Sequence, residues 1–243
     1  MKRYSIHHND QAIEFDIVHR PAVTRRIHLE ISQSGDLQVV APRRMSRRSI
    51  RKALQSRSGS VVGFLQRARS QQQDLTEYHY TSGEEHLFMG QRYPLEIRLR
   101  ERRGARVELE NGRIRLELSH PDQKQVSRHL QDWYRAQAGK YFAERLAAFC
   151  RAAPWAADKE VSMRLRRMKR TWGSCSSKGI ITFNTQLVKA PPECIDYVVA
   201  HEVCHLEEHN HGKAFYALQA RLYPGWKEAK SRLRAQGHIF LHQ

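Results

Sequence analysis

Residues 191–211 read PPECIDYVVAHEVCHLEEHNH, and this stretch decides how the C-terminal half of the chain folds. Two prolines stand at its start, and apolar residues then recur at helical spacing. We therefore predict a helix from residue 193 to about residue 206. The helix carries His201-Glu202-Val203-Cys204-His205, an HExxH pattern. Two histidines four residues apart lie on one helical face, where both imidazoles can bind a single metal ion.

The residue between these histidines adds a chemical group to the predicted metal site. Glu202 follows the first histidine directly, so its carboxylate can accept a proton from water at the metal without occupying the metal. A catalytic zinc site has three protein ligands and one open position. We therefore expect Zn²⁺ to bind His201, His205 and one further ligand.

The third ligand has to come from outside the HExxH pattern. We expect His211, because the asparagine before it and the glycine after it favour a turn toward the helix. On a straight helix Glu208 would lie about 10 Å along the axis from His201, too far for a compact ligand sphere. Glu228, from a downstream helix, and Cys175, as a thiolate, stay open as alternatives.

Upstream of this segment, the apolar pattern changes from strand-like to helical and predicts an α+β fold. Residues 1–120 are predicted to form a β-rich domain, mainly antiparallel with one helix, and Asn111-Gly112 predicts a hairpin turn. A second domain, 121–243, is predicted to begin with a helix over 121–150. Strands over 161–165 and 180–188 are then predicted to form a β-hairpin before the HExxH helix.

Charge is distributed unevenly along the 243 residues. The chain carries 42 Lys+Arg against 25 Asp+Glu, a formal net charge of +17. Nine basic residues within 41–73 and six within 161–180 form two blocks that contain no acidic residue. Such blocks can neutralise phosphates, so they indicate association with nucleic acid; the alternative is that they are solvated faces of the fold.

The chain is predicted to be cytoplasmic. No apolar run approaches the roughly 18 residues that a membrane-spanning helix needs, and polar residues follow Met1 where a secretory signal would be apolar. The four cysteines include no CxxC pair, which argues against a disulfide scaffold and against a four-cysteine zinc site.

Several short motifs together carry a family resemblance. They are RTWGSC (170–175), ITFN (181–184), IDYVVAHEVCH (195–205) and NH (210–211), with VVAP (39–42) and LFMGQRY (87–93) in the N-terminal half. This set resembles the YgjP-like metallopeptidase family, which is related to the SprT-like zinc proteases. The resemblance implies a zincin-like metallopeptidase domain over 121–243, zinc bound by His201, His205 and His211, and Glu202 as the general acid and base.

The predicted function is therefore a zinc metallopeptidase that hydrolyses peptide bonds in protein or peptide substrates. The alternative is a basic nucleic-acid-associated protein, or a protease that acts on DNA-bound proteins, as the SprT-like resemblance implies. We expect the strand over 180–188 to be an edge strand that holds the substrate backbone. Tyr216, Tyr223 and His209 are candidates for stabilising the oxyanion, and the sequence does not choose among them.

Overall fold

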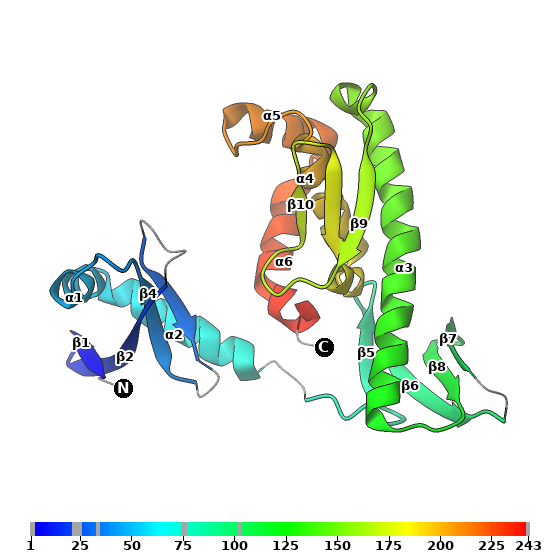
Figure 1. Ribbon diagram of the computed structural model, residues 1–243, viewed down its shortest axis with the longest axis horizontal. Coiled ribbons are helices and arrows are strands. Elements are labelled where there is room, and N and C mark those ends of the chain that lie inside the picture. The colour runs from blue at the N-terminus through cyan, green and yellow to red at the C-terminus, as the bar shows by residue number, and fades with distance from the viewer. Residues whose placement is uncertain (1–2, 21–25, 33–34, 74–76, 102–103, 242–243) are drawn as a thin grey trace. The chain divides into compact units, whose positions relative to one another are not determined.

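The computed structural model describes residues 3–20, 26–32, 35–73, 77–101 and 104–241 (Figure 1). The chain divides into two compact units, Met1–Thr76 and Glu77–Gln243. Both units combine sheets with helices, as the predicted α+β class requires. Within the described residues, no helix is both long enough and apolar enough to span a bilayer.

The first unit is a four-stranded sheet covered by two helices. Its strands are β1 (Tyr4–His8), β2 (Gln11–His19), β3 (His28–Ile31) and β4 (Leu37–Ala41), in the order β1-β2-β4-β3. The pairs β1/β2 and β3/β4 are antiparallel, whereas β2 and β4 are parallel. The helices are α1 (Arg47–Gln55), capped by the Ser46 hydroxyl, and α2 (Ser58–Gln73). The single helix predicted here is therefore two.

The second unit begins with another four-stranded sheet. It contains β5 (Glu85–Phe88), β6 (Gln91–Leu99), β7 (Ala105–Glu110) and β8 (Arg113–Leu118), in the order β5-β6-β8-β7. Asn111 and Gly112 have positive φ angles of 49° and 72° and join β7 to β8, which confirms the predicted hairpin turn. The pair β6/β8 is parallel, so this sheet is not wholly antiparallel.

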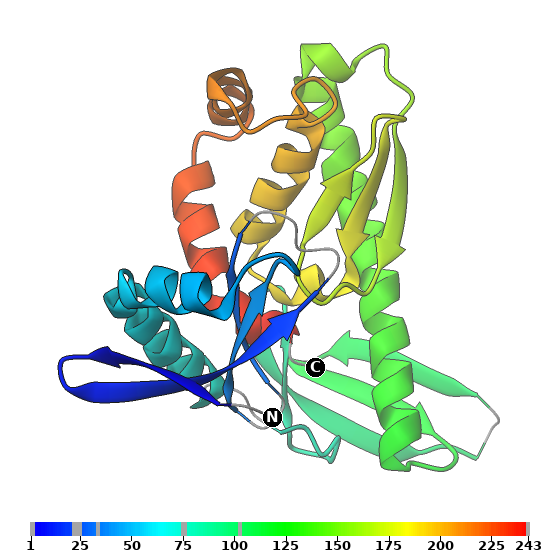
Figure 2. The same cartoon turned by 60° about the vertical axis from the view of Figure 1, so that its left-hand side comes forward.

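Helix α3 (Gln123–Ala152) runs the length of the second unit. The β5–β8 sheet lies at its N-terminal end, and the C-terminal elements lie along the rest of it (Figures 1 and 2). Asp122 caps the helix, and its apolar side, including Leu130, Tyr134 and Phe142, is buried in the main core of the unit. Two short 3-10 helices, η1 (Pro154–Ala156) and η2 (Thr185–Lys189), follow in the chain.

The boundary between the compact units lies at 76/77, whereas the sequence predicted domains over 1–120 and 121–243. The reason is that the β5–β8 sheet is bonded to the C-terminal elements. The Met89 N–H donates to the Val188 carbonyl at 2.9 Å, and the Gly90 N–H donates to the Lys189 carbonyl at 3.0 Å. Alternating strands alone carry no information about which helix covers them.

The HExxH helix packs against a three-stranded sheet. Its strands are β9 (Ser162–Arg166), β10 (Gly173–Cys175) and β11 (Ile180–Asn184), in the order β10-β11-β9. The predicted hairpin between 161–165 and 180–188 is wrong, because β9 and β11 run parallel. β10, inside the predicted loop, forms the antiparallel partner of β11. Helices α4 (Pro192–Cys204), α5 (Lys213–Leu222) and α6 (Trp226–Leu241) complete the unit.

The second unit contains a buried polar cluster around His86. His86 is fully buried, its Nε2 is 3.3 Å from a Glu84 carboxylate oxygen, and its ring stacks on Tyr78. Burial lowers the His86 pKa to about 4, and the buried Lys189 lowers it further while Glu84 acts in the opposite direction. Burial also holds the Lys189 pKa well below its usual range.

We expect this histidine to make the protein sensitive to mild acid. His86 titrates near 6.5 when unfolded and near 4 when folded, so its contribution to stability is complete above pH 6.5 and declines as the pH falls toward 4. Between pH 7.5 and 4.5 we expect His86 to lower the free energy of unfolding by roughly 2 to 3 kcal/mol. Urea denaturation of the parent and of His86→Gln across this range measures it. If the free energy of unfolding fell equally with pH in the two proteins, His86 would not be the group responsible.

Candidate metal centre

The three histidines of the predicted site come from one helix end and the turn that follows it. His201 lies in the last turn of α4, and His205 is its C-terminal cap, with its N–H donating to the His201 carbonyl. The chain then reverses before α5, where the Gly212 N–H donates to the Asn210 carbonyl at 2.7 Å. This turn, expected from Asn210 and Gly212, carries His211 back over α4.

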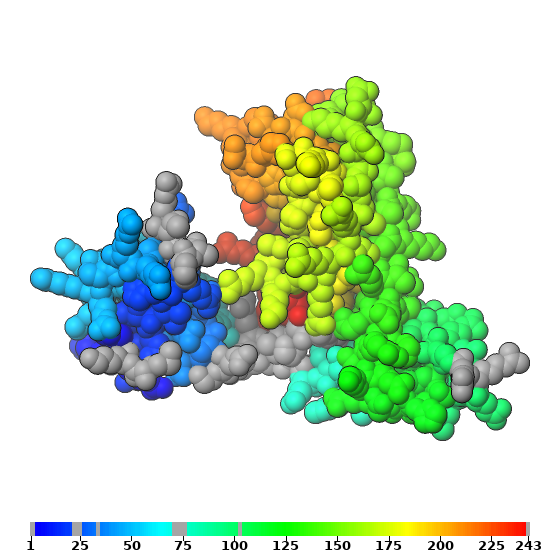
Figure 3. All heavy atoms as spheres, viewed as in Figure 1, coloured from blue at the N-terminus to red at the C-terminus, as the bar shows by residue number. Residues whose placement is uncertain are grey.

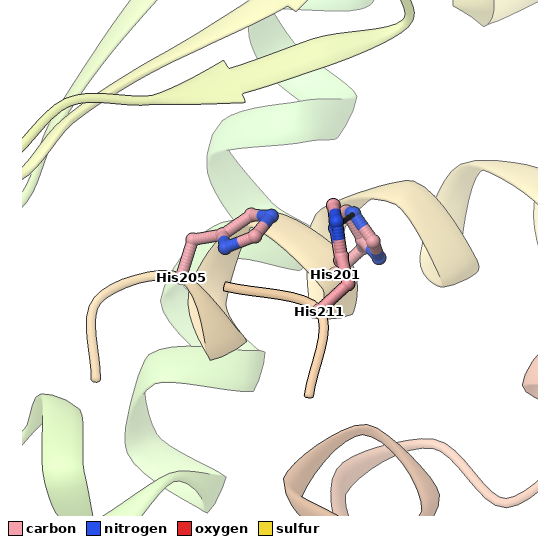
Figure 4. A group of neighbouring side chains, drawn as sticks. All are labelled: His201, His205 and His211. Atoms are coloured by element: carbon pink, nitrogen blue, oxygen red, sulfur yellow. Dashed lines mark hydrogen bonds between the residues drawn. The ribbon is translucent and has the colours of Figure 1, made fainter. Parts of the chain in front are cut away.

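The structure brings His201, His205 and His211 together. One ligand nitrogen from each lies within 4.8 Å of the others, and the Nε2 atoms of His201 and His211 are 3.0 Å apart (Figure 4). Two nitrogens bound tetrahedrally to one zinc ion at 2.0–2.1 Å would be about 3.3 Å apart. The His201–His211 pair is therefore close to the spacing that a shared metal requires, and His205 has a nitrogen within 4.8 Å of both.

Hydrogen bonds at the opposite ring nitrogens fix two of the imidazoles. His201 Nδ1 is 3.1 Å from the Gln219 side-chain oxygen, and His205 Nδ1 is 2.9 Å from the Glu208 carbonyl. Both partners are acceptors, so each Nδ1 carries the proton and each Nε2 keeps its lone pair. This is the arrangement by which histidine ligands are oriented toward a metal.

Burial keeps these histidines in the form that binds metals. It lowers the His201 pKa to about 4, with further contributions from His205, His211 and, more weakly, the ammonium of Lys230. Burial also lowers the His205 pKa. Both rings are thus neutral at neutral pH, and a metal does not have to displace a proton from them.

Glu202 lies at the same helix end, but it is buried. Glu202 is 4 % exposed, one of its carboxylate oxygens has no hydrogen-bond partner among the described residues, and burial raises its pKa to about 8. Gly173 of β10 faces it so closely that a Cβ there would be 2.5 Å from a Glu202 carboxylate oxygen. The glycine therefore leaves room for the carboxylate.

The other candidate ligands lie outside this cluster. Among the described residues, the three histidines are the only group of three or more His, Cys, Asp or Glu side chains that can share a metal. Glu208 contributes its backbone carbonyl to His205 instead of a ligand oxygen. Burial and the nearby Glu202 raise the Cys175 pKa to about 11, so this thiol keeps its proton. Glu228 lies in the first turn of α6.

The edge strand beside the site differs from the predicted one. β11 pairs on both sides, and η2 replaces the second half of the predicted strand 180–188. β10 is an edge strand that contacts α4. The backbone N–H of Ser176 donates to the Ile180 carbonyl, and the Trp172 carbonyl accepts from the backbone N–H of Asn184. By the alternation of an antiparallel pair, the backbone groups of Gly173 and Cys175 then point away from β11.

The residues considered for oxyanion stabilisation are placed differently from one another. The Tyr223 hydroxyl donates to the Glu193 carbonyl at 3.2 Å, near the start of α4 and so away from the histidines. His209 is exposed on the turn. Tyr216 lies beside the cluster, with its ring centroid 6.3 Å from that of His211 and the Lys230 ammonium 5.6 Å from its own. Sequence reasoning did not find Lys230, Gln219 or Gly173, since only tertiary packing brings them here.

We expect Gln219 to position His201. The Gln219 side chain is fully buried, so water cannot replace it as the acceptor of the His201 Nδ1 proton. Gln219→Leu removes this acceptor, whereas Gln219→Glu keeps one. Loss of such a partner typically costs 10- to 100-fold in metal affinity, and we expect about this loss for Gln219→Leu and a smaller one for Gln219→Glu. Competition with a chromophoric chelator measures both. Equal affinities in Gln219→Leu and the parent would contradict this role.

We expect Gly173→Ala to lower peptidase activity by roughly 10- to 100-fold, because the new methyl group displaces the Glu202 carboxylate. Metal content should stay unchanged, since no histidine moves. Gly225→Ala is the matched control, because a Cβ there meets nothing closer than 4.0 Å. Steady-state kinetics of both variants provide the measurement, and equal kcat/KM values would contradict the steric argument.

A cluster of three histidines with a buried glutamate on an HExxH helix is the arrangement of a metallopeptidase. Comparison with known families agrees with this class. A sequence profile described as YgjP-like, metallopeptidase domain, matches residues 25–236. The chain belongs to the YgjP-like family.

Two crystal structures of metallopeptidase zymogens are similar to part of the chain. Pyrococcus abyssi abylysin is 24 % identical with a TM-score of 0.34, and the match covers 37 % of this chain and 93 % of that one. Methanocaldococcus jannaschii jannalysin is 18 % identical with a TM-score of 0.35, covering 39 % of this chain and 95 % of that one. No curated protein matches the chain.

Proposed function

We propose that this metallopeptidase uses zinc held by His201, His205 and His211, with Glu202 as the general base. The observation that supports this most directly is the convergence of three histidine nitrogens within 4.8 Å of one another beside a buried carboxylate. Three imidazole donors suit zinc better than magnesium or calcium, which prefer oxygen ligands. When bound, zinc supplies a Lewis acid and lowers the pKa of water to about 7.

Glu202 moves the proton in this proposal. Its burial keeps it protonated up to about pH 8 in the metal-free protein. A cation held by the three histidines would favour its ionised form. The carboxylate then accepts a proton from the attacking water and delivers it to the leaving amine. One of its oxygens has no competing hydrogen-bond partner within the part of the chain that the structure describes.

We further propose that β10 holds the substrate backbone. The outward-pointing amide and carbonyl groups of Gly173 and Cys175 can pair with an extended peptide, which would add a strand to the sheet. A peptide on this edge would run beside Glu202, because Gly173 lies against that carboxylate. This replaces the strand over 180–188 as the substrate-binding edge.

A cytoplasmic location belongs to the same proposal. All four cysteines are free, as expected where thiols remain reduced. Cys194 and Cys204 are fully buried and behave as small apolar side chains.

A peptide library tests the proposed function even though the natural substrate is unidentified. Protein depleted of metal by a chelator is reloaded with one equivalent of zinc and incubated with a proteome-derived peptide mixture, and new termini are identified by mass spectrometry. We expect cleavages that depend on zinc and are absent in Glu202→Gln. Cleavages that persist equally in that variant would contradict the mechanism.

A further inference from the structure

Unit 1 contains a stripe of basic side chains that the peptidase chemistry does not use. Three pairs of cations recur every four residues, from the end of β4 through α1: Arg43 and Arg44, Arg47 and Arg48, Arg51 and Lys52. All six side chains are exposed. In the space-filling view the side chains of this segment project from the surface of unit 1 (Figure 3). We refer to these six residues as the cationic stripe.

The charges of the stripe are not neutralised within the described part of the chain. The ion pairs described in unit 1 join Arg3 to Glu14 and Asp36, and Arg20 to Glu30. Among the described residues, no carboxylate forms an ion pair with any member of the stripe. An internal counter-charge role, which would explain the block by folding alone, therefore lacks its partners.

The local geometry keeps these cations close together. Ile50 and Leu54 anchor one side of α1 in the core of unit 1, with 0 % and 5 % exposure. The four stripe residues on α1 occupy the remaining helix surface, from the flank of this buried side to the face opposite it, over about 7.5 Å of helix axis from residue 47 to residue 52. A shallow surface depression on this part of α1 is lined by Arg48, Arg51, Lys52, Gln55 and Ser56.

The composition of the stripe favours phosphodiesters over other anionic partners. Five of its six members are arginines, whose planar guanidinium groups bind phosphate oxygens through two hydrogen bonds. A nucleic-acid strand presents a negative charge about every 3.4 Å along its axis, so a row of cations meets several phosphates at once. A bilayer surface fits less well, because the apolar residues of α1 are buried and cannot insert.

We propose that the cationic stripe is a binding surface for the phosphate backbone of nucleic acid. Recognition is by charge and spacing, with no dependence on base sequence. The surface lies within unit 1, and the proposal does not depend on the peptidase activity of unit 2.

Fluorescence anisotropy with the full chain tests this proposal. The probes are labelled 20-mers of duplex DNA, single-stranded DNA and single-stranded RNA, which separate the possible sources of the phosphate backbone. The variant is Arg44→Gln/Arg48→Gln/Arg51→Gln, which leaves the contact of Arg47 with the Tyr4 ring intact. We expect at least tenfold weaker binding at 100 mM KCl, and a slope of log affinity against log salt that is smaller by about 2 to 3.

The matched control removes the same charge elsewhere. Arg135→Gln/Lys140→Gln/Arg151→Gln changes three exposed cations of α3 and should bind within about twofold of the parent. Thermal melting establishes that both variants are folded. The proposal is overturned if the parent binds none of the probes, if the control loses as much affinity as the stripe variant, or if phosphatidylserine vesicles or polyglutamate bind more tightly than every nucleic acid and in the same stripe-dependent way.

Discussion

Glu202→Gln is expected to lower kcat/KM for peptide hydrolysis by roughly 10²- to 10⁴-fold, the usual contribution of a general base. The amide is nearly the same size as the carboxyl group, and Gly173 leaves the same space for it, so packing around the site stays intact. An amide cannot accept the proton of the attacking water. Single-turnover and steady-state kinetics on a peptide identified by mass spectrometry provide the measurement.

The same variant carries its own control for folding and metal binding. Burying Glu202 raises its pKa from 4.5 to about 8, so its favourable contribution to stability declines as the pH rises from 4.5 to 8. Glutamine does not titrate, so the metal-free variant should be at least as stable as the parent at pH 8. Zinc content should stay at one equivalent. A variant that retained both zinc and full activity would show that Glu202 is not the base.

The helix that carries the site was predictable because its signals are local. The double proline, the apolar spacing and the two histidines at positions i and i+4 all lie within one segment of 21 residues, 191–211. The turn around His211 also follows from its immediate neighbours. Local sequence therefore predicts α4 and the convergence of the three histidines, because no distant contact is needed to form them.

The surroundings of the site were not predictable in the same way. Gln219 reaches His201 across the packing of α5 on α4, and Gly173 reaches Glu202 from a three-residue strand with a weak strand pattern. The parallel pairing of β9 with β11 likewise joins segments that are separated by β10. Such contacts depend on the tertiary fold, and spacing along the chain does not encode them.

His201→Ala is expected to abolish stoichiometric zinc binding and, with it, detectable peptidase activity. Structural zinc sites with four ligands contribute about 10–16 kcal/mol, or roughly 3 kcal/mol per ligand, so losing one ligand should weaken affinity by about 100-fold or more. The Nε2 atom removed is one that the structure places 3.0 Å from its counterpart in His211, a separation that allows both to share one metal ion. Metal analysis after gel filtration, together with chelator competition, measures the loss.

His209 serves as a control, because it lies on the turn that carries His211. Replacing it separates the loss of a ligand from any general effect of removing an imidazole. His209 is exposed and stands outside the three-histidine cluster, so His209→Ala should keep one equivalent of zinc. If His201→Ala still bound zinc as tightly as His209→Ala, the metal would have to be held without His201. The assignment of His205 and His211 would fail with it, because no other group of three such ligands is found among the described residues.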